Sequence, residues 1–247
     1  MVELAELPSV ELLEEQARWL APARARLLRN VAIAHCRRVL DLGAGCGVVT
    51  PELVRRARGP VIALDREIAA LQDHAAAFAG ASCVGGDALH LPFAAGGFDL
   101  VFCQLTLLWI FPLTQAIEEI WRILAPGGAL VALEPDYGGM IEHPPEIATR
   151  ELWLHGLARA GADPYVGRKL PALLAQQGFT CRVALFDTLE PPHPARFELL
   201  RGLPLEPAEQ TVLEESVLQS GRLSDGWGQV AHLPFFLVTA LKPRPLH

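Results

Sequence analysis

The sequence predicts an α/β fold with a doubly wound, mostly parallel sheet and helices on both faces. Short apolar segments alternate with helical segments of about ten residues, a rhythm typical of parallel strands joined by crossover helices. The apolar segments are almost uninterrupted, as expected of strands that are buried on both faces. The first of them ends in a glycine-rich turn at residues 43–47, where such sheets bind their ligands.

Residues 9–34 are expected to be helical, with Ser9 as the N-cap and a break at Pro22, because proline removes a backbone donor inside a helix. Thr50 and Pro51 open the helix that follows the glycine-rich turn. The expected strands cover residues 38–42, 61–65, 82–85, 98–104, 129–134, 180–186 and 234–241. Further helices are expected at residues 68–79, 115–124, 145–160, 169–177 and 207–219.

Composition limits the classes of function. The 247 residues carry a formal net charge of −7, which argues against nucleic acid as a general partner because phosphate binding favours a basic face. The five cysteines are scattered, so we expect free thiols in a reducing cytoplasm and neither a disulfide framework nor a metal site. The sequence offers no leader and no apolar run of spanning length, so we expect a cytoplasmic protein without a membrane partner.

The end of the first strand combines a carboxylate with three glycines. Gly43, Gly45 and Gly47 let the backbone approach a ligand closely, and the next helix presents free N–H groups. Asp41 precedes the glycines, and a carboxylate at this place suits a ligand with a positive amino group and would repel a pyrophosphate.

Two more carboxylates follow the next two strands. Asp65 lies about 20 residues after Gly43, the spacing at which an acidic residue accepts hydrogen bonds from ribose hydroxyls. Asp87 can accept a hydrogen bond from an adenine amino group while the N–H of Ala88 meets a ring nitrogen. The three strand ends therefore suit an adenosyl amino acid. The alternative for each aspartate is a cap or turn role, which Asp commonly takes.

These segments resemble the class I S-adenosylmethionine-dependent methyltransferases. They read VLDLGAGCG at residues 39–47, VIALD at 61–65, GDALHLPF at 86–93, FDLV at 98–101 and LAPGG at 124–128. The resemblance covers roughly residues 36–136. It implies a Rossmann-like sheet of seven strands with an antiparallel last strand, the role we give to residues 234–241. It also implies S-adenosyl-L-methionine as cofactor, S-adenosyl-L-homocysteine as product, and a methyltransferase activity.

The resemblance assigns cofactor contacts residue by residue. They are Asp41, Gly43, Ala44 and Gly45 for the methionyl part, Asp65 for the ribose, Arg66, Asp87 and Ala88 around the adenine, and Gln104 through its backbone. After the fourth strand the chain reads CQLTLLW at residues 103–109 and lacks the Asn-Pro-Pro-Tyr-like motif of amide and nucleobase methyltransferases. This departure favours a small-molecule acceptor.

The acceptor is expected to bind after the fifth strand, in residues 134–143. Tyr137 and His143 are the candidate catalytic residues, with Glu142 beside them, because these side chains can orient or deprotonate a hydroxyl or an amine. The alternatives are a packed loop aromatic, a surface histidine and a solvated carboxylate. Methyl transfer depends mainly on alignment and exclusion of water, so no general base is obligatory.

We expect four parts along the chain. Residues 1–35 form a helical lid in which Arg24 either meets the cofactor carboxylate or snorkels to solvent. Residues 36–136 form the cofactor-binding core. Residues 137–168 form a helical insertion that caps the acceptor site; its Trp153, His155, Tyr165 and Arg168 line a pocket or pack in the core. Residues 169–247 complete the sheet and carry a second insertion. The protein is expected to be a monomer or homodimer.

Two rival functions remain. A dinucleotide-binding dehydrogenase would carry a G-x-G-x-x-G turn, but Gly47 is misplaced for that pattern and Asp41 opposes a pyrophosphate. A non-catalytic protein that binds or senses S-adenosylmethionine on the same fold would keep the cofactor motifs, and only the acceptor residues distinguish it from an enzyme.

Overall fold

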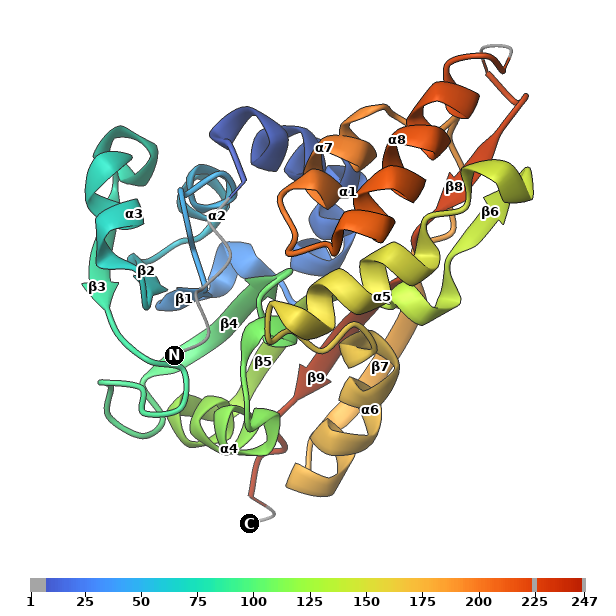
Figure 1. The fold of residues 1–247 in the computed structure, drawn as a ribbon. Coiled ribbons are helices and arrows are strands. Elements are labelled where there is room, and N and C mark those ends of the chain that lie inside the picture. The colour runs from blue at the N-terminus through green and yellow to red at the C-terminus, as the bar shows by residue number, and fades with distance from the viewer. Residues whose placement is uncertain (1–7, 224–225, 246–247) are drawn as a thin grey trace.

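The computed structural model describes residues 8–223 and 226–245 and is built around a seven-stranded sheet (Figure 1). The strand order is β3-β2-β1-β4-β5-β9-β7. These strands are β1 (Val39–Leu42), β2 (Val61–Asp65), β3 (Ala81–Gly85), β4 (Phe98–Gln104), β5 (Leu124–Pro135), β7 (Thr180–Leu185) and β9 (Phe235–Leu241). Strands β1 to β5 pair in parallel, and β9 pairs antiparallel with both β5 and β7. The predicted fold class and the antiparallel last strand are confirmed.

Helices cover both faces of the sheet. They are α1 (Val10–Asn30), α2 (Thr50–Arg56), α3 (Ile68–Asp73), α4 (Leu113–Ile123), α5 (Arg150–Arg159), α6 (Val166–Gln177), α7 (Ala195–Arg201) and α8 (Pro207–Ser220). A second sheet pairs β6 (Ile141–His143) with β8 (Val230–His232). Figure 1 shows this ribbon at the upper right beside α8, far from β1 and β2.

Alternation along the strands produces two apolar layers, because successive strand side chains point to opposite faces. Leu100 and Phe102 of β4 belong to the buried cluster that includes α1 and α2. Val101 and Cys103 belong to the cluster that includes α4, α5 and α6. The carboxyl ends of the parallel strands, where a ligand would bind, therefore sit on a core that is packed from both sides.

Several expected boundaries are wrong. Helix α1 runs through Pro22 without a break, because a buried stripe that includes Leu20 and Leu28 holds it against the sheet. The helix expected at residues 68–79 ends at Asp73 and is followed by a 3₁₀ turn, Ala75–Phe78. The helix expected from residue 145 begins at Arg150. Helix α7 and the β6–β8 ribbon were not expected, since both have short sequences with weak periodicity.

The structure bears on the expectations about cysteines, metal ligands and membrane-spanning helices. All five cysteines are free thiols, and Cys36, Cys46 and Cys103 are buried. The described residues contain no group of His, Cys, Asp and Glu side chains arranged to hold a metal ion. Among the helices of residues 8–223 and 226–245, none combines the length and apolarity that crossing a bilayer requires.

Candidate functional site

The loop after β1 adopts a backbone that glycine takes readily and other residues rarely. The φ angles are +72° at Gly43, +52° at Gly45 and +79° at Gly47, all in the left-handed region. A Cβ on Gly43 would lie 2.2 Å from Cγ2 of Thr106, whereas a Cβ on Gly45 would have no heavy atom within 4 Å. The loop is therefore closely packed at its start and open at Gly45, as a ligand cradle requires.

Asp65 fastens this loop from the end of β2. Its Oδ2 accepts a hydrogen bond from the N–H of Gly45 at 2.7 Å, and its Oδ1 accepts one from the N–H of Glu67 at 3.0 Å. The N–H of Ala44 donates to the carbonyl of Leu64 at 3.1 Å. Each carboxylate oxygen has a second lone pair, so the partly exposed Asp65 keeps acceptor capacity for a pair of hydroxyls.

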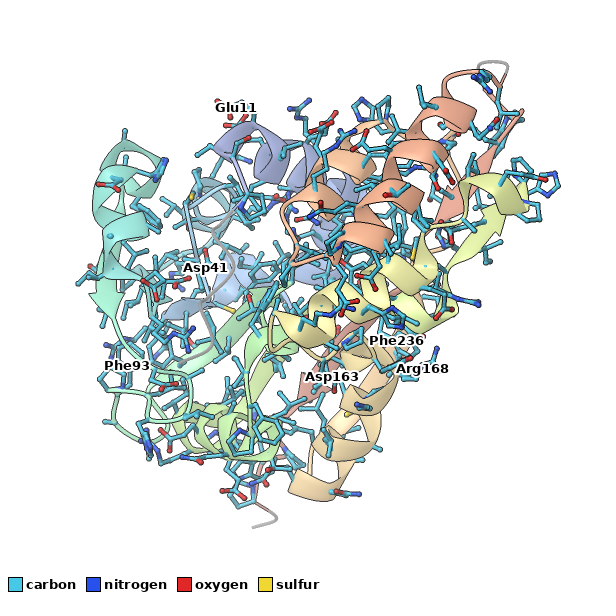
Figure 2. All side chains as sticks on the ribbon, in the orientation of Figure 1. Glu11, Asp41, Phe93, Asp163, Arg168 and Phe236 are labelled. Carbon is cyan, nitrogen blue, oxygen red and sulfur yellow. The ribbon has the colours of Figure 1, made fainter. Side chains whose placement is uncertain are left out.

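Asp41 is buried near the end of β1, to the left of the molecule's centre in Figure 2. Its Oδ2 accepts a hydrogen bond from the Thr50 hydroxyl at 2.6 Å, which ties β1 to the first turn of α2. Burial raises the pKa of Asp41 to about 6, although the Thr50 hydrogen bond and the positive charge of Arg24 oppose the shift. Asp41 thus has an anchoring role in the loop whatever it binds.

The candidate adenine residues lie on the next loop. Asp87 is exposed, and its Oδ1 accepts the N–H of Leu89 at 2.9 Å, a turn that aspartate typically makes. Ala88 is buried beneath it. Arg66 is exposed and lies 3.9 Å from Glu67, a weak surface contact that leaves its side chain free to move.

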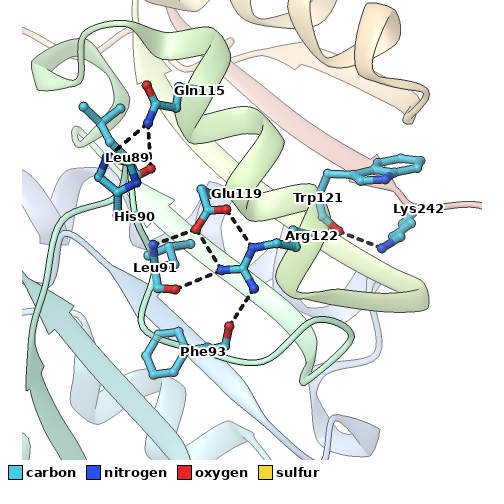
Figure 3. Close-up of polar contacts among 9 residues, drawn as sticks. All are labelled: Leu89, His90, Leu91, Phe93, Gln115, Glu119, Trp121, Arg122 and Lys242. Atoms are coloured by element: carbon cyan, nitrogen blue, oxygen red, sulfur yellow. Dashed lines mark hydrogen bonds and ion pairs between the residues drawn. The ribbon is translucent and has the colours of Figure 1, made fainter.

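Helix α4 fastens this adenine-side loop, a role that was not expected from the sequence (Figure 3). The carboxylate of Glu119 accepts the N–H of Leu91 at 2.7 Å and pairs with Arg122 at 2.7 Å. Arg122 also donates to the carbonyls of Phe93 at 2.7 Å and Leu91 at 2.9 Å. The hydrogen bond from Arg122 holds the pKa of Glu119 below its usual value. The i,i+3 spacing of the two charges was the one available signal.

Gln104 ends β4, where its side chain contacts the N-terminal helix. Its Oε1 accepts a hydrogen bond from Nη1 of Arg24 at 3.0 Å. Arg24 is only 4% exposed and also donates to the carbonyl of Ala17 at 2.9 Å and to Glu52 at 2.8 Å. The snorkelling alternative for Arg24 is therefore wrong. Its guanidinium is directed at acceptors of the chain itself and joins α1 to α2 and β4.

Comparisons with known proteins agree with this geometry. A family model described as a methyltransferase domain matches residues 40–132. The chain is 37% identical over 139 residues to a demethylmenaquinone methyltransferase of Deinococcus radiodurans, across 53% of this chain and 56% of that protein. It is 43% identical over 101 residues to a malonyl-[acyl-carrier protein] O-methyltransferase of Halorhodospira halophila, across 39% of this chain and 34% of that protein. Residues 40–132 of this chain therefore carry a methyltransferase domain.

Solved structures give the same fold over a longer part of the chain. A protein of Bacillus halodurans C-125, described as a candidate methyltransferase, superposes with a TM-score of 0.66 over 89% of this chain and 98% of that chain. The two sequences are 19% identical, so this similarity concerns the fold alone. The chain spans about half the length of the first of these sequence relatives and about a third of the second. The family model matches residues 40–132, which hold the candidate cofactor residues.

On the acceptor side of this methyltransferase fold, Tyr137 is a packed aromatic. It is 4% exposed and stacks on Trp153 with ring centroids 5.0 Å apart. Burial and the neighbouring carboxyl of Glu134 raise the pKa of Tyr137 well above its ordinary value. A phenol in this place is a poor proton acceptor, so the packing alternative describes Tyr137 better than the catalytic one.

The structure does not bring His143 to the cofactor loop. His143 is exposed on β6 opposite Val230, because the β6–β8 ribbon carries it to the far side of the methyltransferase fold (Figure 1). Glu142, beside it, accepts hydrogen bonds from the N–H groups of Thr149 at 2.8 Å and Arg150 at 3.0 Å. Glu142 thus caps the start of α5. Its carboxylate has backbone partners and is not simply solvated, as the alternative for Glu142 had it.

The other candidates of the helical insertion have structural partners. Arg168 pairs with Asp136 at 2.7 Å and lies over the ring of Tyr165 at 5.4 Å. His155 contacts Glu209 at 2.9 Å on the surface. Arg168 lies in the first turn of α6, and Figure 2 places it well away from Asp41. These contacts agree with the packing interpretation of the insertion.

Proposed function

We propose that this chain is a methyltransferase that uses S-adenosyl-L-methionine to methylate a small-molecule acceptor. The observation that carries the proposal is the glycine loop at residues 43–47, which has a left-handed backbone, an open side at Gly45 and a fastening carboxylate in Asp65. The two relatives are named for demethylmenaquinone and malonyl-[acyl-carrier protein] as the acceptors of those proteins. They support an acceptor that is a small molecule or a small group on a carrier.

The donor and acceptor set fits the proposed cofactor. Asp41 and the backbone of residues 43–45 would hold the methionyl part, with Gln104 contributing its backbone. Asp65 would take the ribose hydroxyls. Arg66, Asp87 and Ala88 would surround the adenine. When bound, S-adenosylmethionine supplies an electrophilic methyl group on a sulfonium, and the chain's own residues hold the two reactants in line and exclude water.

The proposed acceptor site lies where the ends of β4 and β5 meet the insertion at residues 137–168. In this arrangement Tyr137 shapes the wall of the site through its stack with Trp153 and takes no proton. No residue of the β6–β8 ribbon has a role in methyl transfer. Catalysis then rests on alignment, which is worth up to several orders of magnitude in rate for a well-oriented pair.

Calorimetry and methyl transfer test this proposal together. S-adenosylhomocysteine is expected to bind at one site, and NAD is expected to give no heat of binding. A survey with tritiated S-adenosylmethionine over quinones, carboxylic acids and a cell extract is expected to give a labelled small molecule. Binding of NAD in place of S-adenosylhomocysteine would refute the proposal. Cofactor binding without any labelled product would favour the non-catalytic binder.

A further inference from the structure

We propose that Glu134 is a positioning residue that holds residues 104–107, here called the β4 corner, against both the cofactor loop and the helical insertion. This inference rests on the proposed function, because its main consequence is a change in cofactor affinity. Glu134 lies at the end of β5, in the strand next to β4. None of the family motifs that identify the cofactor site includes its side chain.

The β4 corner has an unusual backbone. Leu105 has a φ angle of +56°, in the left-handed region that a residue with a branched side chain rarely adopts. Its N–H donates to the carbonyl of Leu133 at 3.0 Å. A strained conformation of this kind persists only where the surrounding structure fixes it. The contacts of Thr106 and Leu107, the next two residues, therefore help to fix the backbone of the corner.

Glu134 supplies those contacts. Its Oε1 accepts hydrogen bonds from the N–H groups of Thr106 at 3.1 Å and Leu107 at 3.0 Å. The side chain is fully buried, and its Oε2 accepts no hydrogen bond from any of the described residues. A buried carboxyl with an unused oxygen opposes stability, so its presence is better explained by the corner that it holds than by the stability of the fold.

The electrostatic surroundings of Glu134 favour a carboxyl that is partly protonated near neutral pH and is stabilised by the amides of the β4 corner. Burial raises the pKa of Glu134 to about 7, and the backbone N–H groups of the corner oppose that shift. The titratable side chains that respond to its charge are those of Tyr137 and Cys103, both buried, and the pKa of each is raised. Neither can neutralise Glu134, so the corner amides are its main stabilising partners.

The β4 corner touches the cofactor loop through Thr106. The side chain of Thr106 occupies the space beside Gly43, where a Cβ would lie 2.2 Å from Cγ2 of Thr106. The Thr106 hydroxyl lies 3.2 Å from the carbonyl of Leu42 and 3.2 Å from that of Gln104. A displacement of Thr106 would therefore be transmitted directly to the start of the glycine loop.

Leu108, the residue directly after the β4 corner, contacts the helical insertion on the other side. The N–H of Asp163, just after α5, donates to the carbonyl of Leu108 at 2.7 Å, and the N–H of Tyr137 donates to Pro164 at 2.9 Å. Tyr137 in turn stacks on Trp153 of α5. The corner that Glu134 holds is thus the junction between the proposed cofactor and acceptor sides.

The test compares Glu134→Gln with Glu134→Ala by titration with S-adenosylhomocysteine. Glutamine keeps an acceptor oxygen for the Thr106 and Leu107 amides, so its Kd is expected to stay within about threefold of the wild type. Alanine removes that acceptor from the buried Leu107 amide and the part-buried Thr106 amide, so its Kd is expected to rise by about tenfold or more. Leu200→Ala, in the buried face of α7, is the control for a general loss of stability and is expected to leave Kd unchanged.

A double variant tests whether Glu134 acts through Thr106. If it does, Thr106→Ala combined with Glu134→Ala weakens binding no more than Glu134→Ala alone, because coupled residues are non-additive. Wild-type affinity in Glu134→Ala, failure of glutamine to rescue, or fully additive losses would each overturn the inference.

Hydrogen exchange separates this inference from the proposed function. In the ligand-free protein the Thr106 and Leu107 amides are expected to exchange faster in Glu134→Ala than in Leu200→Ala at matched stability. If the wild type failed to bind S-adenosylhomocysteine, the proposed function would fall, while this exchange difference would still show whether Glu134 holds the corner. Equal exchange in the two variants would show that it does not.

Discussion

Replacing Gly43 with alanine is expected to destabilise the fold by about 2–5 kcal/mol. The left-handed φ of +72° accounts for about 1–2 kcal/mol of that loss in a residue with a side chain. The rest comes from overpacking, typically about 1–3 kcal/mol, because the new Cβ would lie 2.2 Å from Cγ2 and 2.9 Å from Cβ of Thr106. Thr106 has little freedom to move away, since its N–H is bonded to Glu134.

Gly45→Ala is the matched control in the same loop. Its φ of +52° carries a similar backbone strain, but its Cβ would meet no heavy atom within 4 Å. We therefore expect a stability loss of only about 1–2 kcal/mol, together with weaker binding of S-adenosylhomocysteine, because the new methyl group would enter the open side of the cradle. Urea denaturation of both variants measures the difference. Equal losses of stability for Gly43→Ala and Gly45→Ala would refute the packing argument.

Three more predictions follow from the site. Because the pKa of Glu134 is raised in the folded state, this group stabilises the fold below pH 4.5, and that contribution is lost as the pH rises to about 7. In urea denaturation, the stability of the wild type relative to Glu134→Gln should therefore fall by up to about 3 kcal/mol over that range. A difference that stays constant with pH would contradict the raised pKa. Asp65→Ala should weaken S-adenosylhomocysteine binding by about 1–3 kcal/mol in calorimetry, and unchanged affinity would remove Asp65 from the ribose site. Arg122→Ala should speed hydrogen exchange in residues 87–93, because Arg122 donates to the carbonyls of Leu91 and Phe93. Lys242→Ala is the control and should not, because the Lys242 ammonium donates to the carbonyls of Trp121 and Leu124 on the other side of α4 (Figure 3). Equal effects of the two variants would show that Arg122 does not fasten the loop.

The cofactor side could be predicted from the sequence because its determinants are local. A left-handed turn selects glycine at positions 43, 45 and 47, and buried parallel strands select the apolar runs around them. Asp65 and Asp87 follow strand ends, so their place at one edge of the sheet follows from the parallel order. Each of these glycines, apolar runs and aspartates lies within a few residues of the turn or strand end that it predicts.

The acceptor side depends on contacts between segments far apart in the sequence. Pro22 stays inside α1 because of burial against the sheet, which the helix's own sequence does not reveal. His143 leaves the site because residues 141–143 pair with β8, nearly ninety positions away in the chain. From the sequence, Glu134 is only one residue of the expected acceptor segment, because its hydrogen bond to the Thr106 amide depends on the register of β4 and β5.

A crystal structure with S-adenosylhomocysteine bound would test the central claim most directly. We expect the amino acid part against the backbone of residues 43–45, the ribose hydroxyls on Asp65 and the adenine beside Asp87 and Ala88. We also expect the ligand's sulfur to face the β4 corner. An adenosyl group bound elsewhere, or a bound ligand with its ribose away from Asp65, would refute the proposed cofactor site.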